Sequence, residues 1–142
     1  MRRAGDERGL AMAVEAVVIL PVLVLFIGLV ISLARIAIAE QSVGAAAAAA
    51  ARSASLERSS SRAHSAALEA ARQSLAQRHV ACRTTDVSVD AAGVGRALGQ
   101  RATVNVEVRC LVELRDVSLP FVPGAVSVAA ARTSPVDPLR GR

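Results

Sequence analysis

Aromatic residues are almost absent from this sequence. Its 142 residues include two Phe and neither Trp nor Tyr. Proteins that hold single-stranded nucleic acid stack the bases on aromatic side chains, and this chain lacks those platforms. It also has no Lys, and its 17 basic residues are arginines scattered along the chain rather than gathered in one stripe. We therefore expect no nucleic acid among its partners.

Clusters of catalytic or metal-ligating residues are also missing. Two cysteines are too few for a disulfide-rich scaffold or a four-cysteine zinc module. The two histidines, His64 and His79, stand apart from any nucleophile pattern, and the serine-rich segment has no nucleophile elbow. Gly93 and Gly95 are not followed by the third glycine of a dinucleotide site. The sequence therefore predicts no enzyme, no metal site and no cofactor.

What the sequence does have is one long apolar run, over residues 16–34. It contains no charge, and 14 of its 19 residues are Val, Leu, Ile or Phe. A helix of this length is about 28 Å long, close to the thickness of the hydrocarbon core of a bilayer. The large apolar side chains outweigh Pro21, Gly28 and Ser32 in favouring insertion. We predict a membrane span over about residues 16–34, with membrane lipid as its partner.

The arginines around this run predict its orientation. Arg2, Arg3 and Arg8 precede the run, whereas Arg35 follows it alone until Arg52. An excess of basic residues marks the cytoplasmic side of a membrane helix. We expect a single-pass protein of the cell (inner) membrane, with a cytoplasmic N-terminus and an extracytoplasmic C-terminal domain.

A secretory signal is the alternative interpretation of the same segment. Residues 37–39 before Glu40 have the small-x-small pattern of a cleavage site, and cleavage would fall after Ala39. Against this, the run is longer than the apolar core of ordinary signal peptides, which has about 7–15 residues. The sequence therefore favours an uncleaved anchor.

Beyond the run, the sequence predicts a helical hairpin. Seven consecutive alanines, residues 45–51, favour a helix that continues from residue 10 to 52. Small side chains let helices approach closely, so we expect this part to pack against copies of itself or a partner. The serine-rich residues 53–61 predict a turn, and helical spacing resumes over residues 62–79.

The C-terminal part predicts strands. Residues 102–115 alternate between apolar and polar types, which is typical of a half-buried strand. Shorter strands are expected at residues 85–90 and 126–128, giving a three-stranded antiparallel sheet covered by the helix at 62–79. The fold class is thus α+β. The expected divisions are a leader at 1–9, the long helix at 10–52, the turn and second helix at 53–81, a β domain at 82–133 and a tail at 134–142.

Cys82 and Cys110 lie 28 residues apart. In an extracytoplasmic domain they are expected to form a disulfide. Two free buried thiols are the alternative, and a zinc site with His79 lacks a fourth ligand.

Glu15 stands at the edge of the apolar run. A carboxylate drawn into a region of low dielectric needs a partner, whereas one that stays at the membrane surface remains hydrated. Both interpretations are open on the residues alone.

The residues around Glu15 resemble a known family. Arg8-Gly9, then Val14-Glu15-Ala16, then Ile19-Leu20-Pro21 within a long apolar helix are similar to the N-terminus of TadE-like proteins, minor pseudopilins of the tight-adherence (Flp) pilus system. The alanine-rich continuation and the small β-rich tail also resemble this family in layout.

The resemblance implies a membrane-anchored pilus-assembly component that packs against other pilus-assembly proteins or pilins, with Glu15 and Pro21 setting the register between subunits. It also implies a prepilin peptidase as a partner, cutting between Gly9 and Leu10. Counted from Leu10, Glu15 is the sixth residue, whereas the pilin pattern has Glu at the fifth. Processed and unprocessed anchors are therefore both expected. The competing hypothesis is an envelope protein that binds a partner through its β domain and uses residues 10–39 for targeting only.

Overall fold

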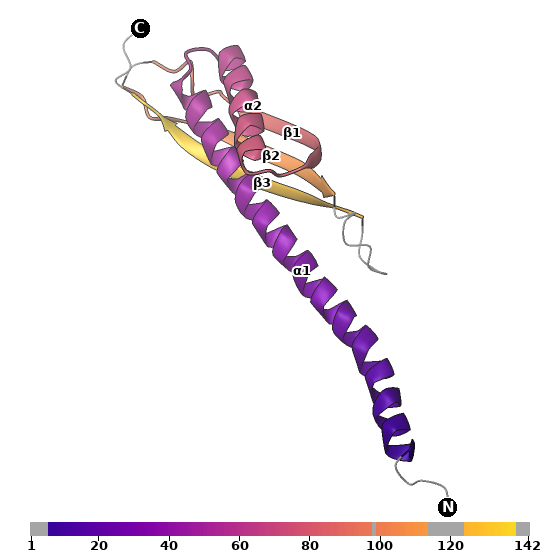
Figure 1. The fold of residues 1–142 in the computed structure, drawn as a ribbon. Helices are drawn as coiled ribbons and strands as arrows, with labels where there is room; N and C mark the ends of the chain where they lie inside the picture. The colour runs from indigo at the N-terminus through magenta and orange to yellow at the C-terminus, as the bar shows by residue number, and fades with distance from the viewer. Residues whose placement is uncertain (1–5, 98, 114–123, 139–142) are drawn as a thin grey trace, which may run out of the picture.

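The computed structural model describes residues 6–97, 99–113 and 124–138, and residues 6–15 by their backbone alone. Two helices precede three strands, which confirms the α+β prediction (Figure 1). The elements, in chain order, are α1 (Asp6–Leu56), α2 (Ser60–Gln77), β1 (Cys82–Asp90), β2 (Ala102–Glu113) and β3 (Ala125–Val136).

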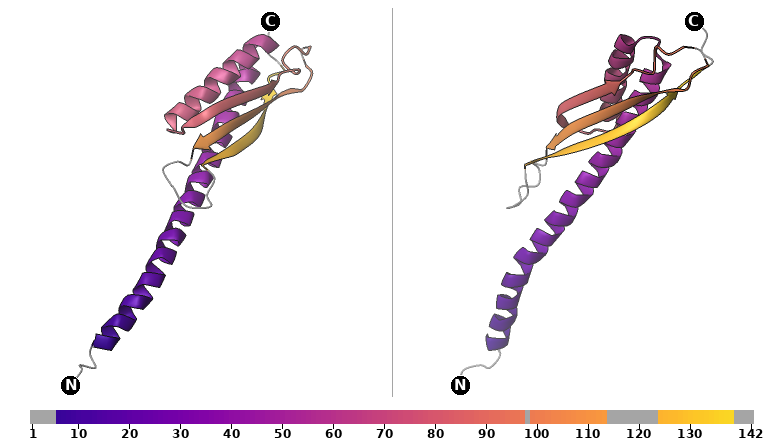
Figure 2. Two further views of the ribbon diagram at one scale, coloured as in Figure 1. Left: turned by 90° about the vertical axis from the view of Figure 1, so that its right-hand side faces the viewer. Right: turned by 180° about the vertical axis from the view of Figure 1, so that it is seen from behind.

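Helix α1 is one unbroken helix of 51 residues, with Pro21 inside it. Its distal half forms part of the domain, and the rest extends away as a rod (Figures 1 and 2). The turn expected over residues 53–61 is shorter than predicted, because α1 continues to Leu56. Ser55 lies in the last turn of α1. Its hydroxyl donates to the Arg52 carbonyl at 2.9 Å, and its side chain is buried.

Helix α2 pairs with the distal half of α1, as the predicted hairpin requires. It begins with Ser59 as its N-cap, whose side-chain oxygen accepts from the backbone N–H of Arg62 at 3.4 Å. The residues that it buries recur every four positions: Ala63, Ala67, Ala71 and Leu75. This spacing puts all four on one face of the helix, so α2 is amphipathic with a narrow, mostly alanine contact surface.

Helix α2 ends in a turn around His79 that two backbone hydrogen bonds close. The Val80 N–H donates to the Leu75 carbonyl at 3.2 Å, and the His79 N–H donates to the Ala76 carbonyl at 3.1 Å. Such a turn needs a residue with positive φ, and His79 has φ of 54°. Glycine adopts this conformation without steric cost, whereas a residue with a Cβ does not.

We expect His79→Gly to raise the free energy of unfolding by about 0.5–1 kcal/mol, because the steric cost of the left-handed conformation disappears. Thermal unfolding of the full chain in detergent, followed by circular dichroism, measures the change. Gln77→Gly is the matched control, since a helical position loses about 1 kcal/mol on the same substitution. A lower melting temperature for His79→Gly would contradict the prediction.

The sheet is an antiparallel meander with strand order β1-β2-β3. β2 alternates as predicted: Val104, Val106, Val108 and Cys110 are buried. Residues 114 and 115, the expected end of this strand, lie outside the described residues. Both neighbouring strands are longer than predicted, because β1 begins at Cys82 and β3 continues to Val136.

The extra length of β3 comes from pairing that a local pattern does not reveal. Ser134 and Pro135 lie opposite Val104 and Thr103, so the segment expected to begin the tail is part of the sheet. The Ser134 hydroxyl also hydrogen-bonds the Ser55 hydroxyl at 3.1 Å. This buried contact joins the end of α1 to the end of β3. The division of the chain into domains stays a prediction.

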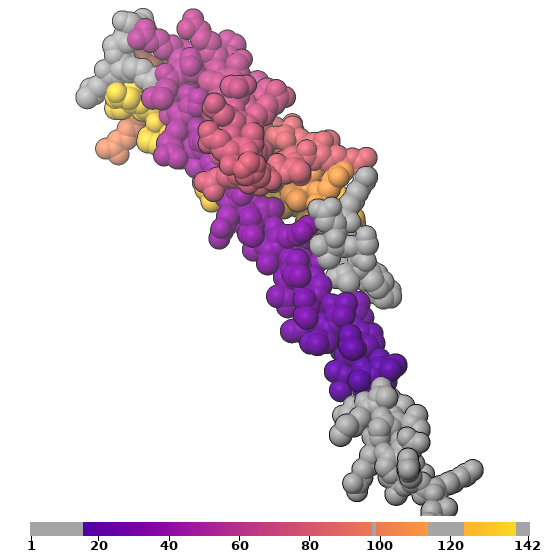
Figure 3. Space-filling view, viewed as in Figure 1, coloured from indigo at the N-terminus to yellow at the C-terminus, as the bar shows by residue number. Residues whose placement is uncertain are grey.

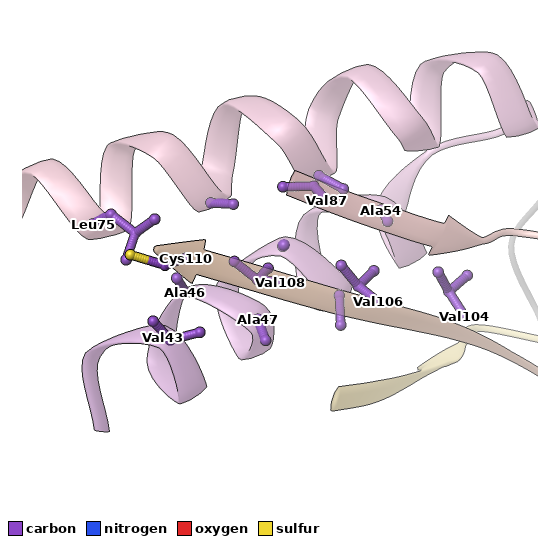
Figure 4. Close-up of a cluster of buried hydrophobic side chains, with 14 of the residues drawn as sticks. Val43, Ala46, Ala47, Ala54, Leu75, Val87, Val104, Val106, Val108 and Cys110 are labelled. Atoms are coloured by element: carbon purple, nitrogen blue, oxygen red, sulfur yellow. The ribbon is translucent and has the colours of Figure 1, made fainter. Parts of the chain in front are cut away.

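The hydrophobic core lies between the sheet and both helices (Figure 4). The helix expected to cover the sheet, α2, contacts β1, and α1 adds to the covering layer because it contacts both β2 and β3. The reason is the size of the side chains. Fully buried alanines on α1 let the helix lie close against the valines of β2.

Candidate functional site

The exposed half of α1 is the candidate functional site. Over residues 16–34 almost every side chain points away from the rest of the chain, and the large ones are about half exposed or more. Val17 is 71% exposed, Phe26 is 61% exposed and Leu25 is 46% exposed. Figure 3 shows this part of the helix standing free of the domain. An apolar surface of this extent is not stable in water, and it marks a membrane or protein interaction surface.

This surface has the length and composition of a membrane span. Among the described residues, one helix is long and apolar enough to cross a bilayer. It is delimited as Ala16–Leu56, and its most apolar stretch of 18 residues has a mean hydropathy of 3.1. The distal part of this helix packs into the core of the domain. The apolar part that projects from the domain is residues 16–34. The structure thus has one candidate membrane helix, near the N-terminus.

The residues predicted for assembly and cleavage lie on α1, whereas the predicted disulfide pair, Cys82 and Cys110, lies on β1 and β2. Glu15 and Pro21 are six residues apart, which places them about 120° apart around the helix, so they are not on one face. The bond between Gly9 and Leu10 lies in the first turns of the same helix. The side chain of Glu15 is outside the described part of the structure, so its pairing stays a prediction, as does cleavage.

Pro21 changes the hydrogen bonding of the apolar run without breaking the helix. It has no N–H, so the Val17 carbonyl, four residues earlier, has no backbone donor within the helix. In hydrocarbon, such a carbonyl must find a donor elsewhere. This is a polar group in the apolar run that a neighbouring subunit can satisfy.

The Ser32 hydroxyl, by contrast, has a hydrogen-bond acceptor within its own helix. It donates to the Gly28 carbonyl at 2.8 Å and is 3% exposed. The Gly28 and Ser32 pair therefore offers small side chains for close helix packing but no free donor.

The disulfide is present, and it joins Cys82 to Cys110 with a Cα–Cα distance of 5.4 Å. It uses both thiols, so the alternatives of free thiols and of a zinc site with His79 are wrong for this structure. Cys82 lies opposite Val112 in the register, so Cys110 is its diagonal neighbour. The bond thus ties the start of β1 to the C-terminal part of β2 rather than to its middle.

The alanine-rich extension of α1 has a different role from the one predicted. Most of its alanines are buried within the chain itself, whereas Ala45, Ala48 and Ala49 are partly buried. The buried apolar positions on this part of α1 are Ala39, Val43, Ala46, Ala47, Ala50, Ala51 and Ala54. They recur mainly at three- and four-residue intervals, which is the signature of one buried helix face. An unbroken run of alanines over residues 45–51 does not reveal this interval in the sequence.

The charged groups of the domain form surface pairs. Arg109 donates to Glu107 at 2.8 Å, and this hydrogen bond raises the pKa of the Arg109 guanidinium above its ordinary value. Arg83 lies 3.9 Å from Glu113. Within the described ranges, no three His, Cys, Asp or Glu side chains gather closely enough to hold a metal ion. The described charges give no arrangement for acid–base or nucleophilic chemistry.

The fold and the exposed helix define a chain with one candidate membrane anchor and a small α+β domain built around the anchor's distal half. The family model described as TadE-like protein matches residues 11–52, which confirms the resemblance seen in the sequence. The matched residues cover the apolar run and most of its alanine-rich extension, but none of the sheet. The chain is thus similar to TadE-like proteins over its first helix. Neither the curated proteins nor the solved structures include a match to this chain.

Proposed function

We propose that this chain is a membrane-anchored, pseudopilin-like component of a tight-adherence pilus assembly machinery, and that it acts by packing its helix against other subunits. One observation carries the proposal. The residues that match the family coincide with a helix whose first part is apolar and exposed while its second part is locked into a folded domain. Such a helix presents a fixed surface to lipid and to neighbouring helices.

The proposed orientation puts the N-terminus in the cytoplasm and the domain outside it. Two features support this: more arginines precede the apolar run than follow it closely, and the domain carries a disulfide. Disulfides persist in oxidising compartments and are rare in the cytosol. The membrane would then be the inner membrane, with a prepilin peptidase acting between Gly9 and Leu10 if the leader is removed.

The contacts with partners fall on residues before the domain. The alanine face of α1 is already used inside the chain, so subunit contacts are left to the apolar run and to Glu15. We propose that Glu15 pairs with a cation of a neighbouring subunit, either another pilus protein or a second copy. An uncompensated charge in apolar surroundings costs several kcal/mol, so such pairing would fix the register between helices.

The experiment that tests this proposal is the substitution Glu15→Ala in cells that assemble the pilus. We expect loss of piliation with unchanged membrane insertion, because the anchor keeps its apolar run and loses only its charge. Glu40→Ala is the matched control: Glu40 is an exposed carboxylate on the same helix but beyond the apolar run. Normal piliation in the Glu15 variant would overturn the proposed role of this residue.

The alternative function, an envelope domain with residues 10–39 used only for targeting, makes a different prediction. It requires a mature N-terminus at Glu40. Ala39 is 4% exposed and belongs to the core of the domain, which favours a helix that stays attached. Mass spectrometry of the mature protein distinguishes starts at Met1, Leu10 and Glu40, and a start at Glu40 would favour the alternative.

A further inference from the structure

The height of the domain above the bilayer is set by α1. The uncharged run ends at Ala34. Ser32 is buried within the run, and the buried apolar positions of α1 begin at Ala39. Five helical residues span about 7.5 Å, which is close to the thickness of one headgroup layer. Because α1 is unbroken across this stretch, no flexible linker separates the anchor from the domain. The lower end of the domain therefore meets the membrane surface.

Helix α2 brings its C-terminus to this same level. It runs back along α1 after a short turn, and its 18 residues return it to about the height of residue 38 on α1. Figure 4 shows Leu75, near the end of α2, beside Val43 and Cys110 in the lowest part of the core. The turn that follows α2, around His79, thus lies at the end of the domain that faces the apolar run, together with the paired ends of β2 and β3 (Figure 1).

The groups at this end are mainly basic. Arg78, His79 and Arg83 are exposed, and Arg35 lies on α1 just beyond the apolar run. The acidic groups facing the same region are Glu40 and Glu113, and Glu113 lies 3.9 Å from Arg83. Among the described residues, Arg78 makes no ion pair. Its side chain projects from the last turn of α2, whose backbone groups are already satisfied by the turn around His79.

We propose that this end of the domain, which we call the basal surface (Arg78, His79 and Arg83), binds anionic phospholipid headgroups of the leaflet on the domain's side. The inference rests on the proposed membrane anchor and adds a second, electrostatic contact to it. An arginine held at an anionic membrane surface increases affinity about fivefold. A domain docked in this way is held upright on its anchor instead of tilting freely about the end of the run.

The test uses the full chain in vesicles of phosphatidylcholine that contain spin-labelled lipids. We expect spin-labelled phosphatidylglycerol to associate with the protein several-fold more than spin-labelled phosphatidylcholine does. The double variant Arg78→Gln with Arg83→Gln should lose most of this preference. The matched control removes two exposed arginines at the far end of the domain, Arg58→Gln with Arg62→Gln, and should keep the preference.

A second measurement tests which end of the domain lies at the membrane surface, without removing any arginine. A fluorophore on Gln77→Cys should be quenched by headgroup spin labels, whereas one on Gln100→Cys, in the connection between β1 and β2, should not. Equal quenching at both sites, or a preference lost equally in both double variants, would overturn the basal contact.

Extraction with alkaline carbonate separates this inference from the proposed function. A chain that stays in the membrane but shows no preference for anionic lipid overturns the basal contact alone. A chain that carbonate releases overturns the anchor, and with it both proposals.

Discussion

Replacing Cys82 and Cys110 by alanine is expected to lower the free energy of unfolding of the domain by about 3.5 kcal/mol. The bond closes a loop of 28 residues, and the chain-entropy estimate for a loop of this length gives that figure. The effect is large for this domain because small cores are only marginally stable. Among the described residues, this core consists mainly of alanine and valine and has no buried aromatic side chain. We expect the double variant to be unfolded or nearly so at 37 °C.

Hydrogen exchange of the β2 amides measures this loss directly, since the chain has no Trp or Tyr to report unfolding by fluorescence. The helix of the anchor stays helical in detergent, so exchange in the strand separates unfolding of the domain from the anchor signal. Reduction of the unmodified protein is the control, because it opens the same loop without changing a side chain. Unchanged protection of β2 after reduction would contradict the prediction.

The second large effect is expected from Ala47→Leu. Ala47 is fully buried on α1 and belongs to the core (Figure 4), so a larger side chain there must displace its neighbours. Overpacking a well-packed core costs about 1–3 kcal/mol, and we expect the upper end of this range because the helix backbone itself lies close to the sheet. The chain should still insert into membranes while protection of the β2 amides falls.

Ala49→Leu, two residues after Ala47 on α1, is the matched control for Ala47→Leu. It adds the same atoms to the same helix, but Ala49 is only partly buried. We expect a change within about 0.5 kcal/mol, as for surface substitutions in general. Equal losses in the two variants would show that helix propensity rather than close packing decides, and would contradict the interpretation of the alanine face.

These two predictions bear on how the anchor and the domain work together. The disulfide and the alanine face both stabilise a domain that has α1 as one of its core elements. Because α1 is one unbroken helix, a movement of its apolar part along the helix axis, or a rotation about that axis, is transmitted directly to the domain.

Much of the fold was predictable from local patterns. The apolar run over residues 16–34 predicted a helix long enough to cross a membrane, and the alternation of β2 predicted which side chains face the core. The cysteine spacing and the expected compartment predicted the disulfide. The C-terminal ends of α1 and β3 were less well predicted. Ser55 and Ser134 lie near these ends and form a hydrogen bond with each other, although they are 79 positions apart in the sequence.

The sequence by itself determined the candidate membrane helix, the strand pattern and the resemblance over the first helix, since each depends on residues that are close together along the chain. Only the tertiary structure decided what the alanines beyond the membrane are for. Alanine has no large side chain whose burial is predictable from its neighbours, so its contacts depend on which surface the rest of the chain brings to it. Here the chain folds back on its own helix, and the surface expected to meet a partner became the centre of the core.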